Sequence, residues 1–340
     1  MITALAWLPM VPLTMLSGRF TSGVREPFLY DYEVHTKLLF SLPLMILAEM
    51  AVYVRTRSVP AQLIERQIIT DSVCFAFNKV ISSAMRLRDS VSAEIALLFL
   101  AVLAGYYIWP DASGPGLDTW YVTVTHSALH RTLAGWWYAF VSVPLFQFVL
   151  LRWYYRIFIW CRFLFQVSRL DLNLVPLHPD RCCALGFLDT ATAGFAPLLM
   201  ANSSLAAGFI AAHIKRDGAS FLDYKFELIG MVAFLLLIFL GPLCVFIPKL
   251  NHAKVTGLET YGCLESRYAF GFAGKGTHDA AAEDERFWGP AADIRSLAAL
   301  ANSLRAVGET KLLPINKATI LMFVGVMALP FVLPVLTMSR

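Results

Sequence analysis

Charged residues are scarce in this chain. Asp, Glu, Lys and Arg make up 15% of its 340 residues, whereas 58% of the residues are hydrophobic, and this balance excludes an ordinary soluble globular protein. The net charge is only +4, and the Lys and Arg residues are spread over short loops instead of forming one basic patch. The sequence therefore predicts no nucleic-acid partner.

The signatures of common catalytic and cofactor sites are also missing. The sequence has no HExxH, no GxSxG and no Rossmann glycine run, and AGKGT at 273–277 lacks the spacing of a phosphate-binding loop. The adjacent Cys182 and Cys183 are poorly placed to bind one tetrahedral metal ion together, and no CxxC or His pair lies nearby. We therefore expect no metal and no cofactor. A secretory signal peptide is not expected either, because no basic residue precedes the apolar N-terminal run.

Long apolar runs, in contrast, are plentiful. Windows of about 18 to 22 apolar residues have the length that a helix needs to cross about 30 Å of hydrocarbon. We predict an all-α fold: a polytopic helical membrane protein with about six transmembrane helices and additional amphipathic cytoplasmic helices. The predicted spans are 37–54, 92–109, 132–151, 186–213, 228–247 and 318–340.

Glycine and proline fall inside several of these spans. Gly194, Pro197 and Gly208 make the fourth span either a kinked helix or a short half-helix followed by a full one. Pro242 lies in the fifth span. Residues 2–16 are apolar but short and interrupted by proline, so we interpret them as an interfacial or re-entrant segment.

Amphipathic segments separate the spans. Within the membrane domain 1–247, an insertion at 55–90 repeats apolar residues at helical spacing, which predicts a helix packed on the membrane or on a partner helix. Arginines among aromatic residues at 156–169 favour an interfacial helix. Residues 248–317 are predicted to form a cytoplasmic helical segment, with an apolar stripe within 285–312.

The distribution of positive charge predicts the orientation. Most Lys and Arg residues lie in 55–90, 152–181 and 248–317, whereas 111–130 has none and 214–226 has three. The positive-inside rule then places the first group in the cytoplasm and both chain ends outside. All six cysteines fall on the cytoplasmic side of this map, where thiols stay reduced. We predict a multi-pass membrane protein with its large loops in the cytoplasm.

The densest cluster of reactive side chains is RLDLNLVPLHPDRCCALGFL at 169–188. Pro179 suits the first turn of a helix, and Asp180 would then lie in that turn, favoured by the helix dipole, with His178 just before it. Arg181 would pair with a lipid phosphate or with Asp180. This is a simple helix cap. The alternative is that His178, Asp180 and one or both adjacent cysteines gather around a bound ion or substrate at the cytoplasmic mouth.

Two further groups of ionisable residues are candidates for a pore or a substrate site. Glu49 lies inside the first span, where a central carboxylate costs about 2.5 to 3.5 kcal/mol, so we expect it to face protein or a water-filled path. The alternative is that it lies shallow enough to reach the interface or to pair with an arginine such as Arg55. Asp31, Glu33 and His35 would share one side of an extended strand, whereas a helix would align only Asp31 and His35. They would line a polar mouth or simply be solvated.

Two stretches, PFLYDYEVHTKLLFSLPLMILAE (27–49) and LVPLHPDRCCALGFL (174–188), resemble an uncharacterised family of bacterial polytopic membrane proteins with an HPD-x-x-x-x-LGFL-like motif. The resemblance covers most of the layout of the chain and implies no activity. It implies a bacterial source, so we expect the protein in the bacterial inner membrane. Small residues and glycine are expected where this chain has Cys182, Cys183 and Ala184, which argues against an essential role for the thiols. The resemblance adds weight to four candidates, Glu49, His178, Asp180 and Arg181.

We favour a homo-oligomeric channel or transporter-like protein that lies in the lipid bilayer and passes ions or small solutes. Three features support this hypothesis: bent spans, an intramembrane carboxylate, and amphipathic helices that need partners. The arginine-rich side would favour anions. One alternative is a membrane-embedded enzyme acting on a lipid or head-group substrate, with His178 and Asp180 as acid–base residues. Another is a non-catalytic scaffold or sensor that recruits a cytoplasmic protein through 55–90 and 285–312.

Overall fold

Helices dominate the structure, as the sequence predicts. The computed structural model describes residues 1–112, 118–125, 128–218, 220–278 and 291–332. Among them the one β-sheet is an antiparallel hairpin, β1 (Val122–Thr125) paired with β2 (Ala128–Arg131). The prediction of an all-α fold is confirmed, and the hairpin is an addition between the second and third predicted spans.

The chain before the hairpin begins with five short helical elements and then forms mainly longer helices. Its elements, with η marking 3-10 or π-helical turns, are α1 (Ile2–Trp7), α2 (Met10–Leu16), η1 (Phe28–Tyr30), α3 (Tyr32–His35), η2 (Thr36–Ser41), α4 (Leu42–Thr56), α5 (Val59–Glu65), α6 (Asp71–Arg88) and α7 (Val91–Ala112). After the hairpin come α8 (Leu133–Trp137), η3 (Tyr138–Ser142), α9 (Val143–Ser168), α10 (Phe187–Ala193), α11 (Ala196–Asp217), η4 (Phe221–Tyr224), α12 (Lys225–Cys244), α13 (Ile247–His278), α14 (Ala291–Gly308), α15 (Lys317–Ala328) and η5 (Leu329–Phe331).

Four helical stretches of the described chain are long and apolar enough to cross a membrane. They are Tyr32–Glu65, Leu133–Ser168, Phe187–Arg216 and Phe221–Cys244. They correspond to four predicted spans, the first, third, fourth and fifth. The predicted spans 92–109 and 318–340 fall on shorter apolar helices, Val91–Ala104 and Lys317–Phe331, and residues 333–340 lie outside the described chain. The predicted count of six spans is therefore not confirmed, since four helices of the described chain have the necessary length and composition.

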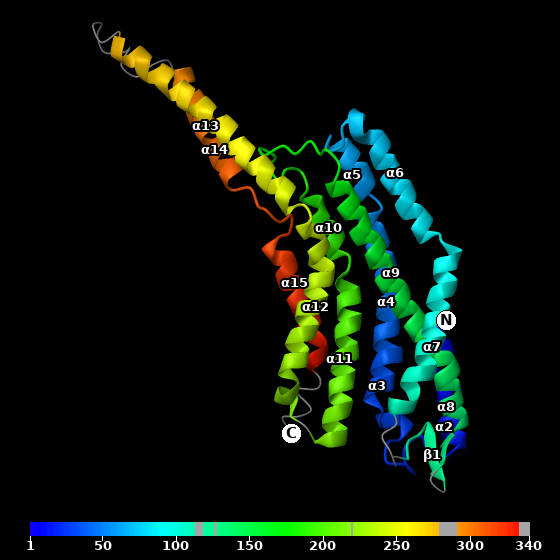
Figure 1. Cartoon of the computed structure of the whole chain (residues 1–340). Helices are drawn as coiled ribbons and strands as arrows, with labels where there is room; N and C mark the ends of the chain where they lie inside the picture. The colour runs from blue at the N-terminus through cyan, green and yellow to red at the C-terminus, as the bar shows by residue number, and fades with distance from the viewer. Residues whose placement is uncertain (113–117, 126–127, 219, 279–290, 333–340) are drawn as a thin grey trace.

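The bundle has two chemically different ends (Figure 1). One end, here called the loop end, holds α5, the connection at 169–186 and the base of α13. The other, here called the hairpin end, holds α2, α3, β1 and its partner β2. The three segments that hold most of the Lys and Arg residues, 55–90, 152–181 and 248–317, meet at the loop end. The hairpin, except for Arg131, comes from the segment 111–130, which has no Lys or Arg. The predicted grouping of loops therefore matches their positions.

The third span is longer than the sequence suggested. Residues 133–168 form one continuous rod of 36 residues, so the segment at 156–169 is not a separate interfacial helix but mainly the last turns of α9. At 1.5 Å per residue this rod is about 54 Å long, against about 30 Å of hydrocarbon. Its loop-end half, which carries Arg152, Arg156 and Arg162, therefore extends beyond its most apolar part.

Residues 55–90 pack on a partner helix. The first span continues to Thr56, α5 follows after a short turn, and α6 then runs beside α9. The ring centroids of Phe77 on α6 and Phe163 on α9 lie 6.4 Å apart, and both side chains are buried. Of the two placements predicted for this amphipathic segment, packing on a helix is the one observed.

The fourth span is a half-helix followed by a full one. α10 ends at Ala193, and α11 starts again at Ala196 with Pro197 in its first turn, where proline lacks only an N–H that is free anyway. α11 packs closely on the first span, because a Cβ at Gly208 would approach the Thr36 Cβ to 2.7 Å. Ser41 Oγ also donates to the Ala201 carbonyl at 2.9 Å. Small residues allow this close helix contact.

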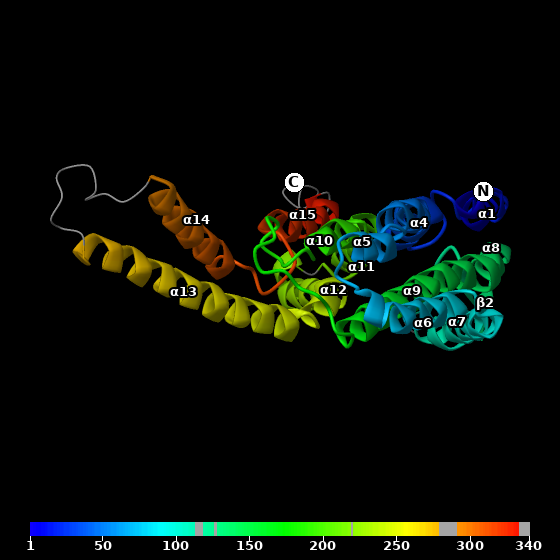
Figure 2. The ribbon, with the colours of Figure 1, turned by 90° about the horizontal axis from the view of Figure 1, so that it is seen from above.

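Segment 248–317 contains two helices that project from the loop end. α13 and α14 are antiparallel neighbours, and Figure 2 shows them leaving the bundle together. The predicted stripe at 285–312 falls mainly on α14, while residues 285–290 lie outside the described chain. The helical prediction for this segment is thus observed over 247–278 and 291–308.

Candidate functional site

The segment 169–186 crosses the loop end without forming a helix. The next helix, α10, begins only at Phe187, so the prediction that Pro179 starts a helix is wrong. Instead the backbone turns through three left-handed non-glycine residues, Arg181 (φ 55°), Cys183 (φ 51°) and Ala184 (φ 74°). Such conformations are costly for residues with a Cβ and persist only where other contacts hold them.

The Asp180 carboxylate holds this turn together. Its Oδ1 accepts from the backbone N–H groups of Cys182 at 2.8 Å and Ala184 at 3.1 Å, and its Oδ2 accepts from Gly186 N–H at 2.9 Å. Burial alone would raise the pKa of Asp180, but these N–H groups and the His178 ring outweigh burial and lower the pKa below its ordinary value. The carboxylate is therefore ionised at neutral pH and offsets the strain of the turn.

His178 and Arg181 extend from this carboxylate in different directions. His178 Nδ1 lies 2.9 Å from Asp180 Oδ1 and accepts from the Asp180 backbone N–H at 3.3 Å when it carries no proton. In the other tautomer Nδ1 donates to the carboxylate and leaves Nε2 free as a base. Arg181 Nη1 pairs with Glu309 Oε2 at 3.0 Å, not with Asp180, and its carbonyl accepts from Lys311 N–H at 2.8 Å. The turn is thus attached to the chain that follows α14.

The two adjacent thiols are buried beside the turn. Burial, aided by the Asp180 charge, raises the pKa of both Cys182 and Cys183 to about 11, so both are protonated at neutral pH. Cys183 belongs to a hydrophobic cluster with Leu164 and Leu185. Within the part of the chain that the structure describes, no three His, Cys, Asp or Glu side chains are grouped to hold a metal ion. The thiols act here as small core side chains.

A cavity of about 570 Å³ opens beside the turn. It lies between the end of the first span and α5 on one side, and the turn, α10 and the chain before α15 on the other. Its polar lining comes from residues far apart in sequence, Arg55, Ser58, Gln62, Arg66, Asp180, Asp189, Thr190 and Asn316. Its volume is within the range of about 300 to 1,000 Å³ of small-molecule sites.

The cavity has arginine side chains without carboxylate partners. Arg55 Nη1 donates to the Thr190 carbonyl at 3.4 Å, and Arg66 Nη1 donates to the Ala184 carbonyl at 3.2 Å. The Arg66 guanidinium also lies 4.9 Å from the ring centre of Phe187. Among the described residues, no carboxylate lies within ion-pairing distance of either guanidinium. Both arginines therefore keep donors for an anion.

The carboxylates that line the cavity are already occupied. Asp180 accepts the three backbone N–H groups of the turn. Asp189 is buried on α10, where its Oδ2 accepts from Asn316 Nδ2 at 2.8 Å and Thr319 Oγ1 at 3.0 Å, and its Oδ1 accepts from Asn316 N–H at 3.1 Å. This charge caps the N-terminus of α15, a favourable place for an anion. The lining thus carries two arginines and two carboxylates, but each carboxylate is held by its own donors and lies beyond ion-pairing distance of Arg55 and Arg66.

Glu49 lies apart from this cavity. It projects from α4 with 51% of its side chain exposed, and its Oε1 lies 2.7 Å from Arg156 Nη2 on α9. Pairing with an arginine was one of the two alternatives for this residue, and the partner is Arg156 instead of Arg55. The pair joins the first and third long helices.

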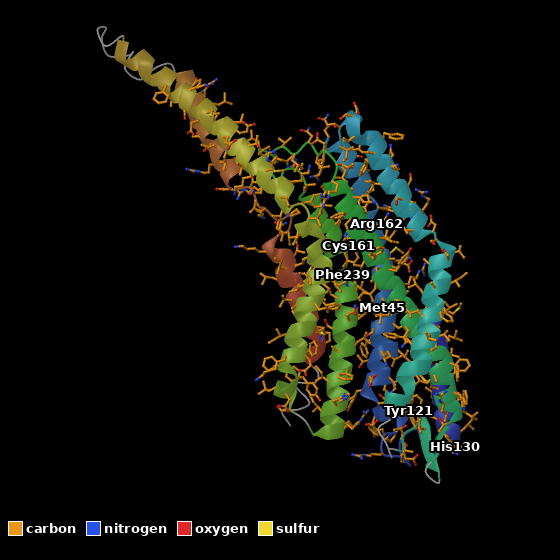
Figure 3. All side chains as sticks on the ribbon, viewed as in Figure 1. Met45, Tyr121, His130, Cys161, Arg162 and Phe239 are labelled. Carbon is orange, nitrogen blue, oxygen red and sulfur yellow. The ribbon has the colours of Figure 1, made fainter. Side chains whose placement is uncertain are left out.

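Asp31, Glu33 and His35 lie at the opposite, hairpin end. They belong to a helical turn, α3 with Asp31 as its N-cap, so the extended-strand alternative is wrong. Asp31 accepts from Val34 N–H at 3.1 Å and from Trp120 Nε1 at 2.8 Å, and burial raises its pKa. Tyr121, a neighbour of Trp120, is labelled at this end in Figure 3.

The other two members of this group are also paired. His35 Nδ1 accepts from Trp7 Nε1 at 3.1 Å, which leaves Nε2 to donate to the Phe28 carbonyl at 2.9 Å and fixes a neutral tautomer. Glu33 pairs with Lys37 at 3.1 Å. Asp31, Glu33 and His35 are thus half-buried and paired at the hairpin end, where Trp7 and Trp120 donate to two of them. They do not join His178 and Asp180 in one site.

Sequence reasoning did not single out the arginines of the cavity as site residues. Arg66 and Ala184 are 118 positions apart, and no spacing in the sequence connects them. The reactive cluster at 169–188 pointed to the turn, and the clustering of positive charge on one side of the predicted membrane pointed to the loop end as a whole. The contact of Asp189 with Asn316 was equally hidden, because it joins residues 127 positions apart.

Comparison of the chain with protein families, with curated proteins and with solved structures found no match. The resemblance carried by 27–49 and 174–188 therefore stays a prediction. The structure nevertheless gives the HPD-x-x-x-x-LGFL pattern a physical reason. The Asp180 carboxylate accepts from Gly186 N–H, and a Cβ at Gly186 would lie 2.9 Å from Asp180 Oδ2, so this position requires glycine.

Proposed function

We propose that the protein is a transporter-like homo-oligomer of the bacterial inner membrane that binds a small anion in the cavity at its loop end. In this proposal α7 and α15 cross the membrane together with the four long apolar helices, and the arginine-rich loop end faces the cytoplasm. The observation that carries the proposal is the pair of arginines, Arg55 and Arg66, which line the cavity without a carboxylate partner.

The break in the fourth span supports a role in transport. Interrupted transmembrane helices commonly border the substrate sites of transporters, because an interrupted helix can rearrange around a ligand. Here α10 contributes to the cavity and ends at the break. A Cβ on Gly194, at the break, would lie 3.2 Å from Arg55 Cδ. A movement of α10 against α11 would therefore displace an anion-binding arginine.

Anion binding and anion flux test this proposal directly. The full-length protein in mild detergent is titrated with inorganic phosphate, sulfate and citrate by calorimetry, and flux of the same anions is measured in proteoliposomes. The double variant Arg55→Gln/Arg66→Gln is expected to weaken binding by tenfold or more, because each charge-assisted hydrogen bond contributes about 1.5 to 3 kcal/mol. The matched control is Arg57→Gln, which removes an exposed arginine near the cavity that contacts the Tyr53 ring.

The outcomes separate binding from transport. Equal binding by the double variant and the Arg57→Gln control would refute the anion site. Anion binding without flux would remove transport but keep a binding protein. Light scattering of the purified protein in detergent tests the homo-oligomer, since a single copy per particle would contradict it.

A second function, catalysis on a lipid or head-group substrate, is favoured by one specific contact. The 2.9 Å approach of His178 to the ionised Asp180 is the arrangement that orients an imidazole as a general base. His178 does not line the cavity, which places this function second. Loss of phospholipid turnover in His178→Gln, with anion binding retained, would support it, and unchanged turnover would end it.

A further inference from the structure

A second hollow, distinct from the cavity at the turn, lies between α9 and α12. It has a volume of about 660 Å³ and a mostly apolar lining, which includes Ile157 and Phe158 of α9 and Leu237 of α12. We call it the α9–α12 groove. Glycine at position 241 of α12 helps to keep it open, because a Cβ there would meet nothing closer than Leu237 Cδ1 at 3.8 Å.

The groove follows one stripe of α9 from the apolar part of the rod toward its arginines. Its α9 residues recur at helical spacing from Tyr154 to Phe165, and its α12 residues begin at Leu237, inside the apolar helix Phe221–Cys244. In Figure 3, Cys161 and Arg162 both lie between the midpoint of the bundle and its loop end. The groove therefore joins membrane-facing apolar surface to a cationic side chain.

That side chain has no partner in the described part of the protein. Of the three arginines on α9, Arg152 lies 3.8 Å from Glu94 and Arg156 lies 2.7 Å from Glu49. Arg162 makes no hydrogen bond, ion pair or ring contact with any described residue, and it is exposed at the groove. A cation at the edge of an apolar groove is suited to a molecule with one acyl chain in the groove and a negative charge beside the guanidinium.

We infer that the α9–α12 groove binds an anionic phospholipid, with an acyl chain along Ile157 and Leu237 and the phosphate at Arg162. The inference rests on the proposed membrane location and assigns a ligand that is separate from the anion of the cavity. The apolar lining selects a lipid over a free phosphate, because a soluble anion would gain nothing from it. The unpaired guanidinium selects a net negative head group over a zwitterionic one.

Photocrosslinking in nanodiscs tests this site with the full chain. The bilayer is phosphatidylcholine containing a small share of phosphatidylglycerol with a diazirine in its acyl chain, and crosslinked peptides are mapped by mass spectrometry. We expect labelling concentrated on 154–165 and 237–245. Arg162→Gln is expected to reduce this labelling about fivefold, since one arginine near the surface has about that effect on anionic-lipid binding.

Two matched pairs of variants distinguish the groove from general lipid contact. Gly241→Leu fills the groove, whereas Gly230→Leu adds the same side chain on α12 at a position with nothing within 4 Å. Arg57→Gln removes an exposed charge elsewhere and controls for Arg162→Gln. Both groove variants should lose labelling and both controls should keep it. Equal labelling in all five proteins, or equal labelling by diazirine phosphatidylcholine, would overturn the inference.

Failure of this inference can be told apart from failure of the proposed function. Liposome flotation is run on the same preparations. A protein that does not float with liposomes would contradict the membrane location and both proposals with it. A protein that floats but is labelled evenly over its outer helices would contradict the lipid site alone, and it would leave the anion cavity to its own titration.

Discussion

Each end of the bundle is organised around one aspartate, and the two carboxylates differ in how many N–H groups they accept. At the hairpin end, Asp31 is half-buried and accepts from one backbone N–H and from the Trp120 indole. At the loop end, Asp180 accepts three backbone N–H groups and is also approached by the His178 ring. Burial favours the neutral acid at both places, but the donors outweigh it only at the loop end.

The two ends therefore respond to protons in opposite ways. The pKa of Asp31 is raised above 3.8 and that of Asp180 is lowered below it. An acid whose pKa is lowered by folding stabilises the protein at pH values above its pKa in the unfolded state. This stabilisation is lost as the pH falls through the pKa in the folded state. An acid with a raised pKa does the reverse, because stability decreases as the pH rises from 3.8 through the folded value. The ionised carboxylate of Asp180 therefore stabilises the turn at the loop end, whereas folding at the hairpin end disfavours ionisation of Asp31.

The largest expected effect comes from removing the charge that holds the turn. Asp180→Asn leaves one acceptor oxygen for three N–H donors, so we expect a loss of about 3 kcal/mol in the free energy of unfolding at pH 7. Reversible denaturation in detergent, followed by tryptophan fluorescence, measures it. Asp89→Asn is the control, because Asp89 pairs with Arg88 on the surface and its loss should change nothing measurable. Equal stability of the two variants would refute the role given to Asp180.

The next effect tests the same turn without touching its charge. Gly186→Ala would bring a Cβ within 2.9 Å of Asp180 Oδ2 and 3.1 Å of its Cβ, so the turn must shift, and we expect a loss of about 2 kcal/mol. Gly325→Ala is the control, since a Cβ there meets nothing within 4 Å and alanine favours the interior of α15 by about 1 kcal/mol. A Gly186→Ala protein as stable as wild type would show that the close approach is not needed.

Much of the fold could be predicted because hydrophobic length is a local property. Windows such as 228–247 identify a long apolar helix without reference to the rest of the chain. The extent of the third rod could not be predicted in the same way, because the arginines after residue 151 resemble the start of an interfacial helix. Arg152 and Arg156 are paired instead with acids of neighbouring helices, which lets α9 continue through them.

The site was predicted as a region but not as a geometry. Local preference placed Pro179 in the first turn of a helix, whereas the chain bends through residues that rarely adopt left-handed backbone. The Asp180 carboxylate outweighs the local preference for helix, because it accepts hydrogen bonds from N–H groups up to six positions away. The only local signal was Gly186, whose spacing from Asp180 has a meaning once the contact is known. Arg66 reaches the cavity through tertiary packing alone.

A smaller effect is expected from the thiols beside the turn. Both have a pKa of about 11 and serve as core side chains, so Cys182→Ala/Cys183→Ala should cost about 1 kcal/mol in total and leave anion binding unchanged. The same denaturation and calorimetry measure both quantities. A tenfold loss of anion affinity in this variant would mean that a thiol takes part in the site. Cys263→Ala, an exposed position on α13, is the control for removal of a thiol.

The smallest effect on stability at neutral pH is expected from Asp31→Asn, and its pH dependence compares the two ends of the bundle most directly. Asp31→Asn keeps one acceptor oxygen for its two donors and removes a buried charge, so the lost hydrogen bond and the removed burial cost nearly cancel, within about 1 kcal/mol at pH 7. The acids Glu33 and Glu26 also face Asp31 and help to raise its pKa. As the pH falls toward 3.8, wild type should gain stability relative to Asp31→Asn, and as the pH falls further below 3.8 it should lose stability relative to Asp180→Asn. Two pH profiles with the same slope would show that both carboxylates respond to burial alone, and that the N–H groups of the turn do not determine its charge.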